Sequence, residues 1–111
     1  MAMQLTCRME RHPDHTRIII PVEEMPRAYM LLDALLLGQL KGFELVGKGG
    51  TLHCHTAEAD GLTPDAWMVA PRSVEYVKSV LLQVTMQPSS AAWLHADIET
   101  PTGDVTISFS N

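Results

Sequence analysis

A chain of 111 residues, of which 46% are hydrophobic and 19% charged, has the size and composition of one globular domain (residues 1–111) rather than of a disordered segment. Its formal net charge of −5 excludes a nucleic-acid partner, because a phosphate backbone would be repelled. The longest apolar stretch is interrupted by Asp33 and falls short of the roughly 20 residues of a membrane span, and no secretory signal is evident. We therefore expect a cytoplasmic protein without membrane contact, with Cys7 and Cys54 as reduced thiols.

The first half of the chain predicts a β-hairpin, a long helix and a second hairpin. Residues 3–9 alternate loosely between apolar and polar, and a β-branched run at 16–22 follows a turn-like segment, which is typical of a hairpin. Residues 24–41 are rich in leucine and lack β-branched residues, so they predict a helix that ends at a glycine. Residues 43–46 and 51–56 flank a glycine-rich turn and predict the second hairpin.

The second half of the chain predicts a second helix and a third hairpin. Residues 63–67 have the form of a helix start and predict a short helical turn. Residues 73–84 place apolar side chains at helical spacing, which predicts a helix, while their valines leave a strand at 80–86 as the alternative. Residues 94–99 and 105–110 alternate strictly on either side of a turn and predict a hairpin. The predicted class is α+β: a single domain with a mainly antiparallel sheet built from hairpins and two helices packed on one face.

The segment TLHCHT, residues 51–56, places two imidazoles on one side of a predicted strand. Because His53 and His55 are two residues apart, both project from the same face, as two metal ligands on a strand would. A zinc or iron site needs a third ligand, and His95 and Asp97 are the candidates if their strand lies beside this one. The interpretation we favour is that all four residues are ordinary polar groups on the wet face of a sheet.

Other polar clusters have both a functional and an ordinary interpretation. The turn at His12–His15 could hold an acid/base pair, or a Cys/His pair with Cys7, but turns collect such residues without function. The loop Gly47–Gly50 lacks the residues and the following helix of a phosphate-binding loop, so it predicts a hairpin turn, and no cofactor is expected. An acidic loop contains Glu58, Asp60 and Asp65. Its carboxylates could bind a cation or a basic partner, or they could simply face solvent.

The predicted first helix carries more apolar surface than one sheet can cover. On the side away from its main apolar face lie Met30, Leu31 and Leu37, with the small residues Ala34 and Gly38 beside them. If these side chains were exposed, an apolar patch of several hundred square ångströms would face water, which monomers rarely tolerate. Either the second helix covers this surface or another subunit does. We predict the second case, an interface of a homodimer.

No motif in the sequence identifies a reaction, so the sequence supports only a choice between broad classes of function. The leading hypothesis is a small acidic binding or accessory module without catalytic activity, acting as a homodimer or as a partner or inhibitor of another protein. The alternative is a small enzyme or ligand-binding protein whose site is lined by histidines and holds a metal in one version. Whether the protein is an enzyme is left open.

Overall fold

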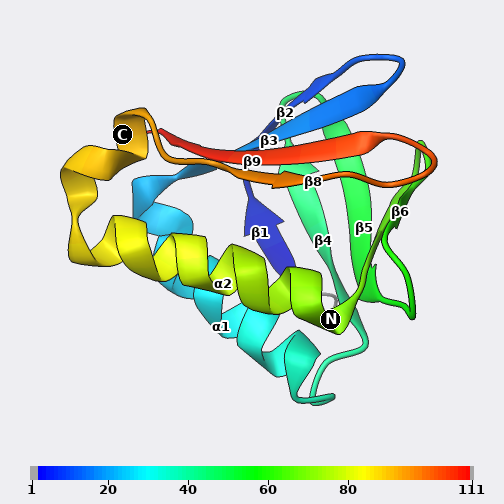
Figure 1. Ribbon diagram of the computed structural model, residues 1–111, viewed down its shortest axis with the longest axis horizontal. Helices are drawn as coiled ribbons and strands as arrows, with labels where there is room; N and C mark the ends of the chain where they lie inside the picture. Colours follow the sequence, from blue (N-terminus) through cyan, green and yellow to red (C-terminus); the bar gives the residue numbers. More distant parts are fainter. Residues whose placement is uncertain (1–2, 111) are drawn as a thin grey trace.

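Two mixed β-sheets share one hydrophobic core in the computed structural model, which describes residues 3–110, and two helices close the open side between the sheets (Figure 1). The five-stranded sheet contains, in spatial order, β1 (Gln4–Thr6), β4 (Gly42–Gly47), β5 (Gly50–Thr56), β7 (Ala66–Val69) and β6 (Gly61–Leu62). The four-stranded sheet contains β2 (Arg8–Arg11), β3 (His15–Pro21), β9 (Asp104–Ser110) and β8 (Ala96–Ile98). The helical elements are η1 (Val22–Glu24), α1 (Met25–Leu36), α2 (Pro71–Met86) and η2 (Pro88–Ala92).

The second and third predicted hairpins are present, whereas in the first only Arg8–Arg11 pairs with β3, and the hairpins do not form one sheet. β4 and β5 pair antiparallel in the five-stranded sheet, while β2–β3 and β8–β9 pair antiparallel in the four-stranded sheet. Three further pairings are parallel: β1–β4, β5–β7 and β3–β9. The α+β class and the two helices are confirmed, whereas the prediction of a single sheet is wrong. Antiparallel pairing dominates without being complete.

The N-terminal segment contributes one strand to each sheet, and this division accompanies the separation into two sheets. Its first part, β1, runs parallel to β4, and the pairing continues where the Cys7 N–H donates to the Val46 carbonyl at 3.0 Å and the Met9 N–H to the Lys48 carbonyl at 2.9 Å. Its second part, β2, pairs with β3 in the other sheet. The crossing is tight, since a Cβ atom added at Gly47 would lie 1.7 Å from the Cys7 carbonyl oxygen. Glycine is therefore required there by space.

Both predicted helices form, with shifted ends. α1 ends at Leu36, earlier than the predicted residue 41, because Gly38 adopts a left-handed conformation with φ of 75°. The Gln39 N–H then donates to the Ala34 carbonyl at 2.9 Å, which is the terminal hydrogen bond of a Schellman motif. Gly38 thus terminates the helix and does not lie on its face. α2 covers the segment 80–86, so the alternative of a strand there is excluded.

The predicted helical turn at residues 63–67 is wrong, since β7 begins at Ala66 and lies parallel to β5. The Thr63 side chain does accept backbone N–H groups, from Asp65 at 3.3 Å and from Ala66 at 3.0 Å, but it closes a turn instead of starting a helix. Trp67 then lies opposite Cys54 and is 2% exposed. Burial of the indole in the common core favours the strand over the local helix-start signal.

The core is continuous across both sheets and the helices. Its largest fully buried side chains come from every layer: Trp67, Leu5, Ile18, Leu31, Leu35, Leu45, Leu52, Leu81 and Ile107. The Cα radius of gyration is 12.6 Å, close to the roughly 13 Å expected of one compact domain of this length. Within residues 3–110, neither helix has the length and apolar character that crossing a membrane requires.

Candidate functional site

The four residues predicted to share a metal lie in two different sheets. His53 and His55 are on β5, whereas His95 directly precedes β8 and Asp97 lies within it. The neighbours of β5 are β4 and β7, and β8 is an edge strand beside β9, so the two strands that the prediction required to be adjacent are not. In residues 3–110, no group of three or more His, Cys, Asp and Glu side chains is placed to hold a metal ion. The four-ligand site is therefore not assembled.

On the five-stranded sheet, the two histidines form an ordinary surface arrangement. His53 lies opposite Glu44 of β4, and its Nδ1 is 3.2 Å from the Glu44 Oε1 atom. The rings of His53 and His55 are tilted, with centroids 5.5 Å apart. A half-exposed cross-strand pair of this kind contributes at most about 1 kcal/mol and needs no function to explain it.

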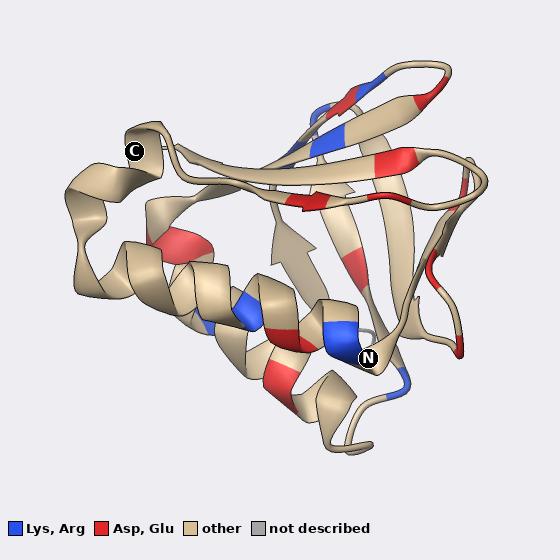
Figure 2. Cartoon of the chain, in the orientation of Figure 1, with Lys and Arg blue, Asp and Glu red and all other residues tan. Residues whose placement is uncertain are grey.

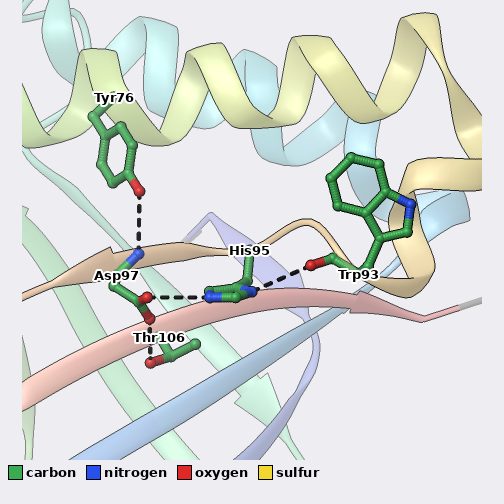
Figure 3. Close-up of polar contacts among 5 residues, drawn as sticks. All are labelled: Tyr76, Trp93, His95, Asp97 and Thr106. Carbon is green, nitrogen blue, oxygen red and sulfur yellow. Dashed lines mark hydrogen bonds and ion pairs between the residues drawn. The ribbon is translucent and has the colours of Figure 1, made fainter.

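On the four-stranded sheet, His95 and Asp97 belong to a connected polar group (Figure 3). The His95 ring contacts two oxygens, with Nε2 3.1 Å from the Asp97 Oδ2 atom and Nδ1 3.3 Å from the Trp93 carbonyl. The Thr106 hydroxyl donates to the other Asp97 oxygen at 2.9 Å, and the Asp97 N–H donates to the Tyr76 hydroxyl at 3.3 Å. Both carboxylate oxygens of Asp97 are therefore already engaged by neighbours within the chain.

This polar group borders a pocket on the outer face of the four-stranded sheet. The pocket has a volume of about 430 Å³ and lies beside η2 and the segment that follows it. One row of paired residues crosses all four strands, in the order Glu10, Arg17, Thr106 and Asp97. The side chains of this row point away from the core, because their neighbours along each strand are buried.

Two arginines provide the positive charge of the pocket. Arg8 on β2 and Arg17 on β3 both line it, and Figure 2 shows basic segments on these two neighbouring strands. Within the described residues, neither guanidinium lies within 4.0 Å of a carboxylate or takes part in a side-chain hydrogen bond, although Glu10 is directly opposite Arg17. Arg11, by contrast, donates to the backbone carbonyls of Pro64 and Thr51. The pocket thus contains two cationic groups without an ion-pair partner in the part of the chain that the structure describes.

No protein-family model matches this chain, and no curated protein matches it. Its function is therefore argued from the chemistry of its own surfaces.

Neither cysteine is placed to act as a nucleophile. Cys7 and Cys54 are free and buried, and burial raises the pKa of the Cys7 thiol to about 11 and also raises the pKa of Cys54. Both thiols are consequently protonated at neutral pH, the unreactive form. The predicted turn histidines His12 and His15 stack on each other with centroids 4.3 Å apart, and the hydrogen bond from His15 lowers the pKa of Asp14. This turn lies on the surface and contains no nucleophile.

The predicted acidic loop has a structural role through one of its members. Asp60 accepts the Ala70 N–H at 2.8 Å and the Ser73 hydroxyl at 2.6 Å. Both groups belong to the start of α2, so this carboxylate satisfies donors that the helix leaves unpaired and complements its dipole. Glu58 and Asp65 remain exposed on the surface.

The predicted interface residues of the first helix divide between core and surface. Leu31 is only 1% exposed because α2 packs against α1, so it belongs to the core and not to an interface. Met30 and Leu37 are 52% and 62% exposed, and Ala34 lies half-buried beside them. Gly38 is exposed in the turn that ends the helix. Part of the expected apolar surface therefore remains uncovered.

Sequence reasoning missed the residues that define the outer-face pocket, namely Arg8, Arg17 and Ser108. Their outward direction was readable, because each alternates with buried neighbours along its strand. The β2–β3 hairpin brings the two arginines together, whereas the position of Ser108 beside them was not readable, since β3 and β9 pair in parallel although they are distant in the chain.

Proposed function

We propose that the protein is a binding module without catalytic activity that associates with a second copy of itself through the outer surface of α1 and α2. The observation behind this proposal is that Met30 and Leu37 stay 52% and 62% exposed after α2 has covered the rest of α1. α2 adds Leu82 and Met86, which are 47% and 77% exposed. We call Met30, Leu37, Leu82 and Met86 the helix surface. Exposed apolar side chains on two packed helices are typical of an association site.

Polar groups on the helix surface would give such an association a fixed geometry. The Lys78 ammonium is 2.6 Å from the Asp33 carboxylate and 5.1 Å from the centre of the Tyr29 ring, so it bridges the two helices. The Asp33 hydrogen bond raises the pKa of Lys78, which is therefore charged at neutral pH. Tyr29, Lys78 and Leu82 line one shallow groove between the helices. A two-fold axis at this groove would bring two identical surfaces together.

The energetics suit a weak dimer. Moving the exposed parts of the four apolar side chains out of water contributes about 5 kcal/mol per subunit, and a two-fold interface counts this surface twice. The resulting total of about 10 kcal/mol is opposed by an association cost of roughly 4–15 kcal/mol. With an association cost near the low end of that range, about 6 kcal/mol remains, which corresponds to a dissociation constant of tens of micromolar.

Light scattering coupled to gel filtration tests this proposal directly. The wild-type chain should run as a dimer at about 100 µM and dissociate on dilution towards about 1 µM. Leu37→Asp should give a monomer throughout. Gln39→Asp adds the same charge two residues away without removing apolar surface, so it should leave the dimer intact. A wild-type monomer at the highest concentration would contradict self-association and leave only the version with a different protein partner.

A cytoplasmic location forms part of this proposal. It is supported by the two free cysteines, because unpaired thiols persist in a reducing compartment. The alternative of a histidine-lined enzyme or ligand-binding site is favoured by one observation only, the presence of His95 and Asp97 at the outer-face pocket.

A further inference from the structure

The outer-face pocket of the four-stranded sheet combines positive charge, a hydroxyl and an apolar wall. Arg8 and Arg17 supply the charge, Ser108 the hydroxyl, and Ile19 and Leu94 part of the wall. We propose that this pocket binds a small phosphate monoester, with its phosphate group held between the two guanidinium groups. The site is separate from the proposed dimer surface, because it contains none of the helix-surface residues.

The register of β2 and β3 allows both arginines to reach one anion. Arg8 lies opposite Ile19, and Arg17 precedes Ile19 by two residues on the same face of the sheet. Diagonal neighbours of this kind have Cα atoms about 7–8 Å apart, a separation that two arginine side chains easily span. Each guanidinium presents a planar fork of donors that matches phosphate oxygens. Ser108 lies opposite Ile19 on the other side, so its hydroxyl faces the same pocket.

Among residues 3–110, no carboxylate lies within 4.0 Å of a guanidinium nitrogen of Arg8 or Arg17. Asp97, the carboxylate at the far end of the row, is occupied by His95 and by the Thr106 hydroxyl. Glu10, at the near end, lies beyond 4.0 Å of any Lys or Arg nitrogen in the part of the chain that the structure describes. Two neighbouring guanidinium groups repel each other, and an anion between them would remove that repulsion.

Charge and donor number favour phosphate over carboxylate. One guanidinium fork suffices for the two oxygens and the single charge of a carboxylate. Two guanidinium groups with the Ser108 hydroxyl suit a phosphate monoester, which carries a charge of about −1.5 to −2 and three terminal oxygens.

The dimensions of the pocket favour a small molecule over a polymer. Its volume of about 430 Å³ lies within the roughly 300–1,000 Å³ usual for small-ligand sites. The apolar wall from Ile19, Leu94 and η2 would contact the organic part of the ester. A nucleic acid would require a longer series of phosphate contacts than one pair of arginines provides.

Calorimetric titration of the full chain with three anions tests the ligand class. Phenyl phosphate should bind with a dissociation constant below about 1 mM, and at least about tenfold more tightly than benzoate or inorganic phosphate. The fluorescence of Trp93 offers a second measurement of binding, and it should change when phenyl phosphate is added. Trp93 borders the pocket and is 68% exposed, whereas Trp67 is 2% exposed. Equal affinities for benzoate and phenyl phosphate would overturn the assignment to phosphate. Absence of any response up to about 10 mM would overturn the site itself.

Arginine variants test the location. Arg17→Gln should weaken phenyl phosphate binding at least about tenfold, and Arg17→Lys should restore little of it, because an ammonium keeps the charge but loses the fork. Arg72→Gln on α2 removes the same charge outside the pocket and should change the affinity by less than about twofold. If circular dichroism shows that Arg17→Gln does not fold, Arg8→Gln takes its place. Equal losses of affinity for phenyl phosphate in the pocket variant and in Arg72→Gln would refute the proposal.

Discussion

Replacing Leu31 by alanine should lower the free energy of unfolding by about 3 kcal/mol. The side chain is 1% exposed and lies in the core shared by the helices and both sheets. Leucine-to-alanine changes at such positions cost roughly 2–5 kcal/mol, because apolar surface is lost and a cavity remains. Against a total stability of about 5–15 kcal/mol this is a large effect, equivalent to a fall in melting temperature of about 12 °C.

Leu37→Ala is the matched control, because it makes the same chemical change on the same segment. Leu37 is 62% exposed, so its removal leaves no cavity and should change the stability of the monomer by less than about 0.5 kcal/mol. Urea denaturation of both variants, followed by circular dichroism at a concentration where the wild type is monomeric, separates the two values. Similar losses in the two variants would refute the assignment of Leu31 to the core and of Leu37 to the surface.

Three further predictions concern the fold and the cysteines. Asp60→Asn should cost about 1–2 kcal/mol in thermal denaturation, because a charged acceptor at the start of α2 is replaced by a neutral one; an unchanged melting temperature would contradict this role. Gly47→Ala should abolish the cooperative unfolding transition, since its Cβ would overlap the Cys7 carbonyl; a stable, wild-type-like variant would show that the crossing of the sheets is looser than described. Both thiols should react with a disulfide reagent at pH 8 only after denaturation, because burial raises the pKa of the Cys7 thiol to about 11 and that of the second cysteine as well; rapid reaction of the native protein would refute their protonated, buried state.

Local elements could be predicted because their signals are local. Alternation along residues 105–110 and the glycine turn between β4 and β5 indicated the hairpins that the structure contains. The leucine-rich segment indicated α1, but its end was misplaced because the glycine that terminates it looked like a small residue on a helix face. Thr63 indicated a helix start that is absent, since the same side chain closes a turn as readily as it caps a helix.

Sheet assignment could not be predicted from these signals. β1 and β2 are nearly continuous in sequence yet belong to different sheets, and what separates them is the contact of this segment with Gly47 and its neighbours. The alternative of a metal site shared by the two histidine-bearing segments was wrong for the same reason. Two strands with polar faces can share a site only if they are neighbours, and neighbours in a sheet are set by long-range pairing.

The outer-face pocket also shows the limit of arguing from net charge. A formal charge of −5 describes an average over the chain, and it argues against extended contact with a phosphate polymer. Binding of one small anion depends instead on the few charges within about a Debye length of roughly 8–10 Å. The pocket places Arg8 and Arg17 near two carboxylates: Asp97, which His95 and Thr106 engage, and Glu10, which lies opposite Arg17. An acidic chain can therefore hold two neighbouring cationic groups, because the β2–β3 hairpin brings the arginines together and parallel pairing of β3 with β9 adds Ser108.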